Sequence, residues 1–498
     1  MRRPSLLLFA IFLLAGCGSV LEVGIERTPT PDVAPAATMT AMASEISRLA
    51  TRVAAQVTPT PSTPPDLGHL AYVQGGDIWV RALPTGTPQR LTTDGHNSSP
   101  RWSPSGLWLA FRKERQVMVE QECEASRLRP QVCLESVPVL QKQVWVVEAE
   151  SNSAHLLSQG TSIDAFAWSP VDDRLAYSTA GGGLSTVYAD GADVVRLVSQ
   201  TTGDDNSSGR LGRLAWHPDG TSLAYEWWGQ LPTQTLAYQG LWQVSLDGRK
   251  RVELYAGSLP QKGEAVLAGW SPQGRRVLFW QGEAPLASLT NGAPLYSISA
   301  GKTQSNTNVL AQLETKELML RYSDFIAPAP RGTSPEMRDT VALVVGSGRS
   351  TWNNKHIELA GRAISPKGLA AISPAWSPNG ARLAFVAAPD RADLLSEEAI
   401  RVGLMQRRIW VTDVIGELEP QRLTSGAAYR EERPLWSADG SHLLFARMDA
   451  RGRASLWLMA MAGGAPRQVV DELTPAPDPV DSYGHIDWET LFDWWRGT

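Results

Sequence analysis

Apolar and polar residues alternate along this chain in short runs, and one pattern of runs occurs six times. In each copy an aromatic residue ends one run, a Ser-Pro turn or a close variant follows, and a second apolar run begins. Alternation with a period of two predicts a strand with one buried face, and Pro and Gly favour a tight turn between two strands. Each copy therefore predicts a β-hairpin. The copies begin at Trp102, Trp168, Trp216, Trp270, Trp376 and Trp436.

Two further phrases extend each hairpin to four strands. An aliphatic residue followed by Trp begins a third run, as at Ile78-Trp79, and an Arg-Leu pair closes a fourth, as at Arg90-Leu91. Four short strands that cannot bury both faces alone are typical of a β-propeller blade. Over roughly residues 67–495 the phrases resemble the repeats of TolB-type periplasmic proteins, which are related to WD repeats. The resemblance implies an all-β propeller and protein interaction in the bacterial envelope.

The spacing of the copies predicts the number of blades. The interval between Trp270 and Trp376 is about twice the others, so a degenerate blade is expected there. The N-terminal repeat starts at His69 with a second strand, and Trp488 near the C-terminus resembles a further motif tryptophan. We therefore expect a C-terminal strand to complete the N-terminal blade and close an eight-bladed ring. Seven blades are the alternative, with residues 271–375 as one blade with a long insertion. The strands expected in the degenerate blade are 324–326, 341–345 and 356–359, followed by a closing phrase at 362–365.

The N-terminus carries a targeting pattern. Arg2 and Arg3 precede an apolar stretch that is too short to span a membrane, and Leu14-Ala15-Gly16-Cys17 follows. The pattern resembles a bacterial lipoprotein signal, which implies that residues 1–16 are removed and that Cys17 carries the lipid. An ordinary secretory signal is the alternative. The expected location is therefore the cell envelope, with the exported chain anchored to the bacterial membrane through its lipid.

Residues 17–66 differ in composition from the rest and predict a tether. Thr-Pro runs at both ends favour extended spacers. Between them, about residues 36–56, apolar residues at heptad spacing on an alanine-rich background predict a short helix. Weak self-association through that helix and a transient helix are both open. The propeller domain is expected over residues 67–498.

Cys123 and Cys133 are the two cysteines of the chain besides the expected lipid-bearing Cys17. An even pair in an oxidising compartment predicts a disulfide that closes a local loop. Free thiols or a redox pair are the alternative.

The length of the connections predicts which rim of the propeller binds a partner. The Ser-Pro turns are short and uniform, whereas the second-to-third connections vary, and in a four-stranded meander the two kinds lie on opposite rims. Variable loops on a rigid scaffold are the usual place for binding. The insertion at 386–408 on that rim predicts a helix, because acidic residues occupy its start and arginines its end. The candidate binding residues are His96, Asn97, Trp227 and Trp228, with packing as the alternative for the tryptophans.

Composition and motifs narrow the chemistry. A net charge of −5 gives no basic footprint for nucleic acid, so no nucleic-acid partner is expected. The chain has no Gly-x-Ser-x-Gly and no His-Glu-x-x-His, and neither a catalytic residue, a metal nor a cofactor is expected.

These patterns favour a membrane-anchored scaffold that binds a protein, peptide or glycan in the envelope, and they favour it over an enzyme. The alternative is a carbohydrate-active enzyme, a lyase or glycosidase, with its site in the central funnel. Acidic residues near first strands could meet there, namely Asp164, Asp324 and Asp487.

Overall fold

The computed structural model describes most of the chain after residue 64. The described ranges are 65–122, 134–151, 153–157, 162–181, 183–199, 208–230, 237–258, 264–282, 292–301, 312–315, 317–331, 333–415, 419–474 and 483–497. The expected signal peptide, Cys17, the tether with its helix, and the pair Cys123 and Cys133 lie outside these residues and stay predictions. Within the described ranges, no helix has the length and apolar character needed to cross a membrane.

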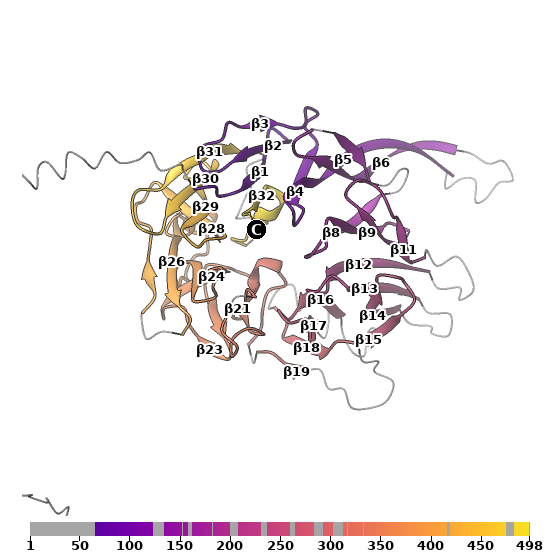
Figure 1. Ribbon diagram of the computed structural model, residues 1–498. Helices are drawn as coiled ribbons and strands as arrows, with labels where there is room; N and C mark the ends of the chain where they lie inside the picture. The colour runs from indigo at the N-terminus through magenta and orange to yellow at the C-terminus, as the bar shows by residue number, and fades with distance from the viewer. Residues whose placement is uncertain are drawn as a thin grey trace, which may run out of the picture. The chain divides into compact units, whose positions relative to one another are not determined.

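The described strands form eight sheets of four strands each, arranged in a ring (Figure 1), and we name these blades A to H in chain order. Blades A and B contain β32 (Phe492–Trp495), β1 (His69–Gln74), β2 (Asp77–Ala82) and β3 (Gln89–Arg90), then β4 (Asn97–Trp102), β5 (Trp108–Glu122), β6 (Leu134–Glu148) and β7 (Ala154–Leu156). Blades C and D contain β8 (Ile163–Trp168), β9 (Arg174–Thr179), β10 (Leu184–Tyr188) and β11 (Val195–Val198), then β12 (Ser208–Trp216), β13 (Ser222–Gln230), β14 (Ala237–Ser245) and β15 (Arg251–Ser258). Blades E and F contain β16 (Glu264–Trp270), β17 (Arg276–Gly282), β18 (Leu295–Ser299) and β19 (Gln312–Leu313), then β20 (Ile326–Pro328), β21 (Val341–Val345), β22 (His356–Leu359) and β23 (Arg362–Ala363). Blades G and H contain β24 (Leu369–Trp376), β25 (Arg382–Pro389), β26 (Arg408–Asp413) and β27 (Gln421–Arg422), then β28 (Tyr429–Trp436), β29 (His442–Asp449), β30 (Ala454–Ala460) and β31 (Arg467–Leu473).

The all-β, eight-bladed architecture predicted from the repeats is confirmed, and so is the degenerate blade. In blade F the strands β21 and β22 have the predicted bounds. Its first strand starts later than predicted, because residues 323–325 form the short 3₁₀ helix η2 (Ser323–Phe325) and only then does β20 begin.

Ring closure by the C-terminus is also confirmed, since β32 pairs with β1. The tryptophan assigned to that strand was wrong, however. Trp488 lies in the 3₁₀ helix η3 (Trp488–Thr490), and Trp494 stands opposite Leu70 as Trp102 stands opposite Leu109 in blade B. The closing strand is therefore the one that contains Trp494.

The repeated tryptophans join neighbouring blades as well as filling the core. In five blades the indole N–H of the motif tryptophan donates to a backbone oxygen of the preceding blade. The acceptor is the residue just before that blade's own motif tryptophan, or the equivalent residue in blade F, which has no such tryptophan. A buried indole N–H needs such a partner, so this bond explains why tryptophan occupies the position. The five bonds are Trp168 to Arg101 at 2.9 Å, Trp216 to Ala167 at 2.9 Å, Trp270 to Ala215 at 3.0 Å, Trp376 to Ala327 at 2.8 Å and Trp436 to Ala375 at 3.0 Å.

Hydrogen bonds also explain the other repeated phrases. In the first Ser-Pro turn the N–H of Gly106 donates to the carbonyl of Ser103, and Gly106 has a φ of 75°, which glycine adopts without strain. After the Arg-Leu pair, the hydroxyl of Thr92 accepts the N–H of Ile78 at the start of the third strand. Thr424 does the same for Ile409, and Ser365 does so in the degenerate blade. The closing phrase therefore joins the end of the fourth strand to the start of the third strand in these blades.

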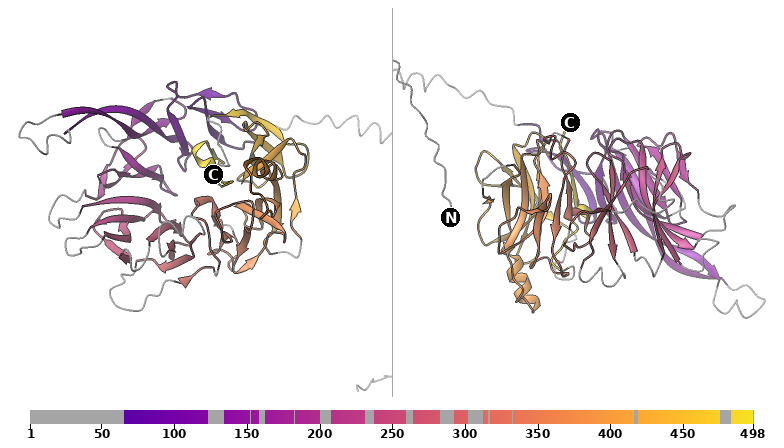
Figure 2. Two further views of the ribbon diagram at one scale, coloured as in Figure 1. Left: turned by 180° about the vertical axis from the view of Figure 1, so that it is seen from behind. Right: turned by 90° about the horizontal axis from the view of Figure 1, so that it is seen from below.

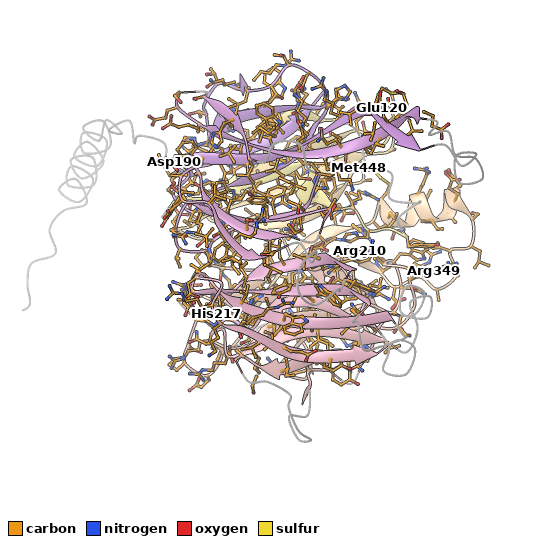
Figure 3. All side chains as sticks on the ribbon, turned by 90° about the vertical axis from the view of Figure 1, so that its right-hand side faces the viewer. Glu120, Asp190, Arg210, His217, Arg349 and Met448 are labelled. Atoms are coloured by element: carbon orange, nitrogen blue, oxygen red, sulfur yellow. The ribbon has the colours of Figure 1, made fainter. Side chains whose placement is uncertain are left out.

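The two rims of the ring differ as the connections predicted. Figure 3 places Asp190 and His217, from short turns, on one rim, and Glu120 and Arg210 on the other. The helix α3 (Glu397–Leu404) projects from the latter rim (Figure 2). We call the rim that carries Glu120 and α3 the loop-rich rim.

Candidate functional site

A two-stranded arm extends from blade B beyond the rest of the sheet (Figures 1 and 2). Strand β4 pairs with β5 only as far as Lys113, and β7 pairs with β6 only from Trp145. The arm is defined here as residues 114–122 of β5 paired with 134–142 of β6. No described strand pairs with either outer edge, although at the base of the arm the N–H of Glu114 donates to the carbonyl of His96 and the N–H of Lys142 donates to the hydroxyl of Ser162. Beyond these two bonds, the backbone groups of the described edges are available to another strand.

Both faces of the arm carry aliphatic side chains. Strand pairing places Val117 opposite Val139 and Val119 opposite Val137 on one face, and Met118 opposite Pro138 on the other. Met118 is 62% exposed, Leu140 53%, Val119 44% and Val139 43%. A two-stranded ribbon has no core of its own, and clustered exposed apolar residues mark interaction sites. The alternating valines Val117, Val119, Val137 and Val139 were a signal for strands that the sequence analysis did not use.

A hollow of about 620 Å³ lies where the arm leaves the ring. His96, which is exposed, lines it together with Asp94 and Lys113. Lys113 forms an ion pair with Asp94. Burial alone would raise the pKa of the Asp94 carboxyl, but Lys113 and Asn97 hold it below its ordinary value. The hollow therefore combines fixed charges with the apolar Leu140 of the arm.

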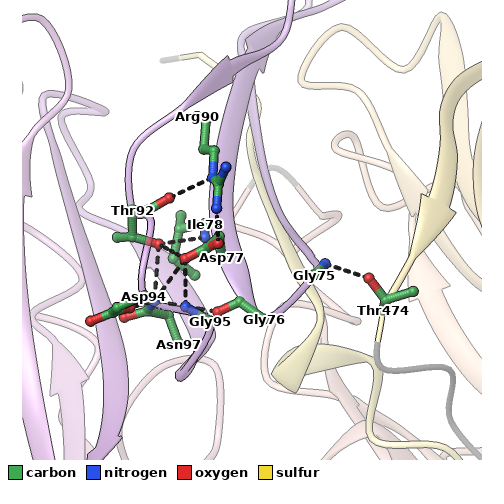
Figure 4. A network of polar contacts seen from close by, with 10 residues as sticks. All are labelled: Gly75, Gly76, Asp77, Ile78, Arg90, Thr92, Asp94, Gly95, Asn97 and Thr474. Carbon is green, nitrogen blue, oxygen red and sulfur yellow. Dashed lines mark hydrogen bonds and ion pairs between the residues drawn. The ribbon is translucent and has the colours of Figure 1, made fainter.

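Asn97 has a structural environment beside this hollow (Figure 4). Its side chain is buried, and its amide donates to the hydroxyl of Thr92 at 3.0 Å and to the carboxylate of Asp77 at 3.3 Å. Asp77 in turn accepts the N–H of Gly95 at 3.0 Å. These bonds fix the connection from blade A to blade B and so position His96.

Trp227 and Trp228 lie on β13 in blade D and do not join His96 and Asn97 in one site. Trp227 is 4% exposed and packs in the core that blades C and D share. Trp228 is half-buried, and its indole N–H donates to the carboxylate of Glu226 at 3.4 Å. The guanidinium of Arg210 lies 5.8 Å from the ring centroid of Trp228. Of this pair, Trp228 alone presents surface to solvent.

The helix predicted at 386–408 is present but shorter, because β25 and β26 extend into the insertion. Ser396 caps α3 by accepting the N–H of Ala399, and Arg401 pairs with Glu397 one turn away. Leu404 of the helix, together with Leu394 just before it, packs against Trp352 near blade F. It therefore covers a neighbouring blade.

The three acidic residues proposed for the funnel are only partly brought together. Asp164 is exposed on blade C. Asp324 and Asp487 lie closer together at the centre of the ring, where the negative charge of Asp324 contributes to raising the pKa of Asp487. Asp324 accepts hydrogen bonds from His485 at 2.8 Å and from Ser373 at 3.2 Å. Burial raises the pKa of Asp487, and the negative charge of Glu489 raises it further.

The C-terminal residues 483–491 supply groups at the ring centre that the sequence analysis did not assign. His485 stacks on Tyr322 with ring centroids 3.7 Å apart. Glu489 bridges two blades, since its carboxylate pairs with Arg101 at 2.9 Å and with Arg433 at 2.8 Å. Burial alone would raise the pKa of Glu489, but these two arginines hold it below its ordinary value. The carboxylates of Asp324 and Glu489 are therefore committed to partners. Among the described residues, no group of three or more His, Cys, Asp or Glu side chains could hold a metal ion.

Asp324 provides a test of how this segment is held. Burial alone would raise the pKa of Asp324, but His485, Arg433 and Ser373 together lower it. Its contribution to stability is then present above its ordinary pKa of 3.8 and is lost as the pH falls through the lowered value. We expect Asp324→Asn to be less stable at neutral pH and to lose less stability than the wild type between pH 5 and pH 3. Urea unfolding followed by circular dichroism over this range checks it, and equal slopes would contradict it.

Comparison with known proteins identifies the fold but no family. No protein-family model matches the sequence, and no curated protein matches it. Dipeptidyl peptidase 4 from Porphyromonas gingivalis gives a TM-score of 0.52 at 11% identity, over 84% of this chain and 61% of that one. Oligogalacturonate lyase from Vibrio parahaemolyticus gives a TM-score of 0.40 at 12% identity, over 84% of this chain and 88% of that one. TolB from Acinetobacter baumannii gives a TM-score of 0.32 at 10% identity, over 87% of this chain and 65% of that one. The chain thus spans about 61% of the length of the peptidase, and the likeness shows the propeller fold alone.

Proposed function

We propose that this protein is a membrane-anchored, extracytoplasmic scaffold that binds a protein partner through the arm of blade B. The observation that carries the proposal is the arm itself, with aliphatic side chains exposed on both faces and two edges with which no described strand pairs. Propellers host many unrelated activities, so the function is argued from this feature and not from the fold.

The chemistry of the arm favours a protein over a glycan. Sugars are commonly met by exposed aromatic rings, whereas the described exposed side chains of the arm include Val119, Val139, Met118 and Leu140. An unpaired strand edge can accept an extended segment of a partner, with main-chain hydrogen bonds for affinity and side-chain contacts for specificity. The hollow at its base adds the charged pair Asp94 and Lys113 for orientation.

The N-terminal sequence supports the anchored part of the proposal. Leu14 to Cys17 resembles a lipoprotein signal, and residues 17–66 have the composition of a spacer. A lipid on Cys17 together with an extended tether would hold the ring away from the membrane surface and leave the arm free to reach a partner.

The experiment compares capture of cross-linked envelope proteins by the full chain and by an arm variant. The variant Met118→Gln, Val119→Thr, Val139→Thr keeps strand-forming residues at the valine positions and removes three of the four most exposed apolar side chains of the arm, leaving Leu140. We expect the proteins captured by the wild type to be lost from this variant, while its thermal unfolding midpoint is unchanged, because these side chains are exposed.

A matched control carries polar substitutions on the opposite rim. Leu107→Gln, Val194→Thr alters two side chains that are 52% and 61% exposed, and it should capture the same proteins as the wild type. Capture that survives in the arm variant, or that is lost equally in the control, would contradict the assignment of the arm.

A further inference from the structure

The inner strands of blades F, G and H line a half-open cavity of about 320 Å³ at the centre of the ring, apart from the arm. Its walls present polar and apolar surface in about equal amounts, and two arginines reach it. Residues that line it include Pro330, Pro374, Trp376, Trp436, Arg433 and Arg496.

Backbone bulges shape this cavity. Ser373 and Arg433 occupy the same position, three residues before the motif tryptophan, and both have a positive φ, 52° and 49°. Each precedes a proline, and the strand pairing shifts register at each point. The same bulge occurs in blade B, where Ser99 has a φ of 54°, precedes a proline and lies outside the cavity, so the bulge belongs to the repeat. In blades G and H it places Ser373 and Arg433 at the wall of the cavity.

Most charges around the cavity are already paired. Arg433 binds Glu489 at 2.8 Å, and Asp324 binds His485 at 2.8 Å. These pairs leave the rim of the cavity nearly neutral and hold it in one arrangement.

Arg496 differs from these paired groups. Among the described residues its guanidinium makes a single hydrogen bond, from Nη1 to the backbone oxygen of Trp436 at 3.4 Å. The carboxylate of Asp493 lies near Arg496 and accepts the N–H groups of Trp102 at 2.8 Å and of Trp494 at 3.0 Å, but among the described residues no hydrogen bond joins it to Arg496. Arg496 is exposed, and its guanidinium stays charged at neutral pH. Arg496 therefore offers free donors to an anion in the cavity.

We propose that this cavity is a binding site for a small monocarboxylate with an apolar body. The planar fork of Arg496 matches a carboxylate, and the prolines and tryptophans match an aliphatic remainder. Phosphate is disfavoured, because it has no apolar part to contact the prolines and tryptophans and because the single guanidinium of Arg496 balances only one negative charge.

The test measures binding of N-acetyl-L-leucine to the full chain by isothermal titration calorimetry. N-acetyl-L-leucinamide has the same body without the charge, and inorganic phosphate has the charge without the body. We expect the acid to bind, and the amide and phosphate to bind at least about tenfold more weakly, since the amide loses the charge-assisted bidentate contact and phosphate loses the apolar contact.

Substitutions identify the site. Arg496→Gln should weaken binding of the acid at least about tenfold, whereas Arg249→Gln, at a side chain that is 88% exposed on the surface, should leave binding unchanged. If Arg496→Gln does not fold, Arg496→Lys keeps the positive charge without the planar guanidinium. This variant should bind N-acetyl-L-leucine more weakly than the wild type and bind N-acetyl-L-leucinamide equally well. The proposal is overturned if the wild type does not bind the acid, if acid and amide bind equally, if phosphate binds more tightly, or if folded Arg496→Gln retains full affinity.

Discussion

Trp494→Ala is expected to lower the free energy of unfolding by about 3–5 kcal/mol, the range for removing a buried tryptophan side chain. Trp494 is buried in the closing strand β32, and its indole N–H donates to the backbone oxygen of Leu67 at 2.7 Å. The substitution removes packing where the two ends of the domain meet, so it should also expose the edge of β1. Urea unfolding followed by far-ultraviolet circular dichroism measures the loss.

Two comparisons separate closure of the ring from packing. Trp494→Phe keeps most of the apolar volume and should cost about 1 kcal/mol, the worth of one hydrogen bond. Trp376→Ala removes an equivalent tryptophan from blade G, where the chain continues on both sides. In limited proteolysis, Trp494→Ala should release the C-terminal segment first and Trp376→Ala should not. Identical cleavage patterns, or a loss below about 1 kcal/mol for Trp494→Ala, would show that β32 does not hold the ring closed.

Arg407→Ala is expected to lower stability by about 3–5 kcal/mol, because it leaves a buried carboxylate without its nearest cation. Arg407 donates to Glu432 at 2.7 Å and to the carbonyl of Gly484 at 2.8 Å, and the side chains of the ion pair are 2% and 3% exposed. It also donates to the hydroxyl of Thr351 at 2.7 Å. One side chain thus joins blades G and H, the Thr351 loop and the C-terminal segment. Thermal and urea unfolding of the variant test this.

Removing both charges distinguishes an unpaired carboxylate from lost packing. Arg407→Met, Glu432→Leu replaces the pair with apolar side chains and should recover part of the stability lost in Arg407→Ala, since the buried Arg430 then loses the carboxylate that lies 3.6 Å from it. Arg453→Ala, at a pair in which the arginine side chain is 62% exposed, should cost less than about 1 kcal/mol. If Arg453→Ala and Arg407→Ala destabilise the protein equally, burial does not decide the strength of these pairs.

The repeated phrases predicted the blades because their residues act locally. The Ser-Pro-x-Gly turn, the alternating strands and the Arg-Leu-Thr closing phrase are each fixed by bonds within one blade, such as that between Thr92 and Ile78. Even the degenerate blade kept a serine, Ser365, in place of the threonine. The prediction failed at Trp488, because the choice between Trp488 and Trp494 depends on pairing with β1 at the other end of the chain.

The candidate sites were less predictable from the sequence. The alternating valines of the arm were visible as strand signals, but their exposure depends on the absence of a covering element among the described residues. The three-residue spacing in Ser373-Pro-Ala-Trp376 and Arg433-Pro-Leu-Trp436 was also visible. That these residues line a single cavity with Arg496 could not be read from it.

The sequence by itself determined the blade, its turns and the number of blades, since these follow from side-chain periodicity and from bonds between residues near in the chain. Only the tertiary structure decided which tryptophan closes the ring, how Glu489 joins Arg101 and Arg433, and where the guanidinium of Arg496 lies. These features depend on groups brought together from segments 56 to 427 residues apart, where local pattern carries no information about distance.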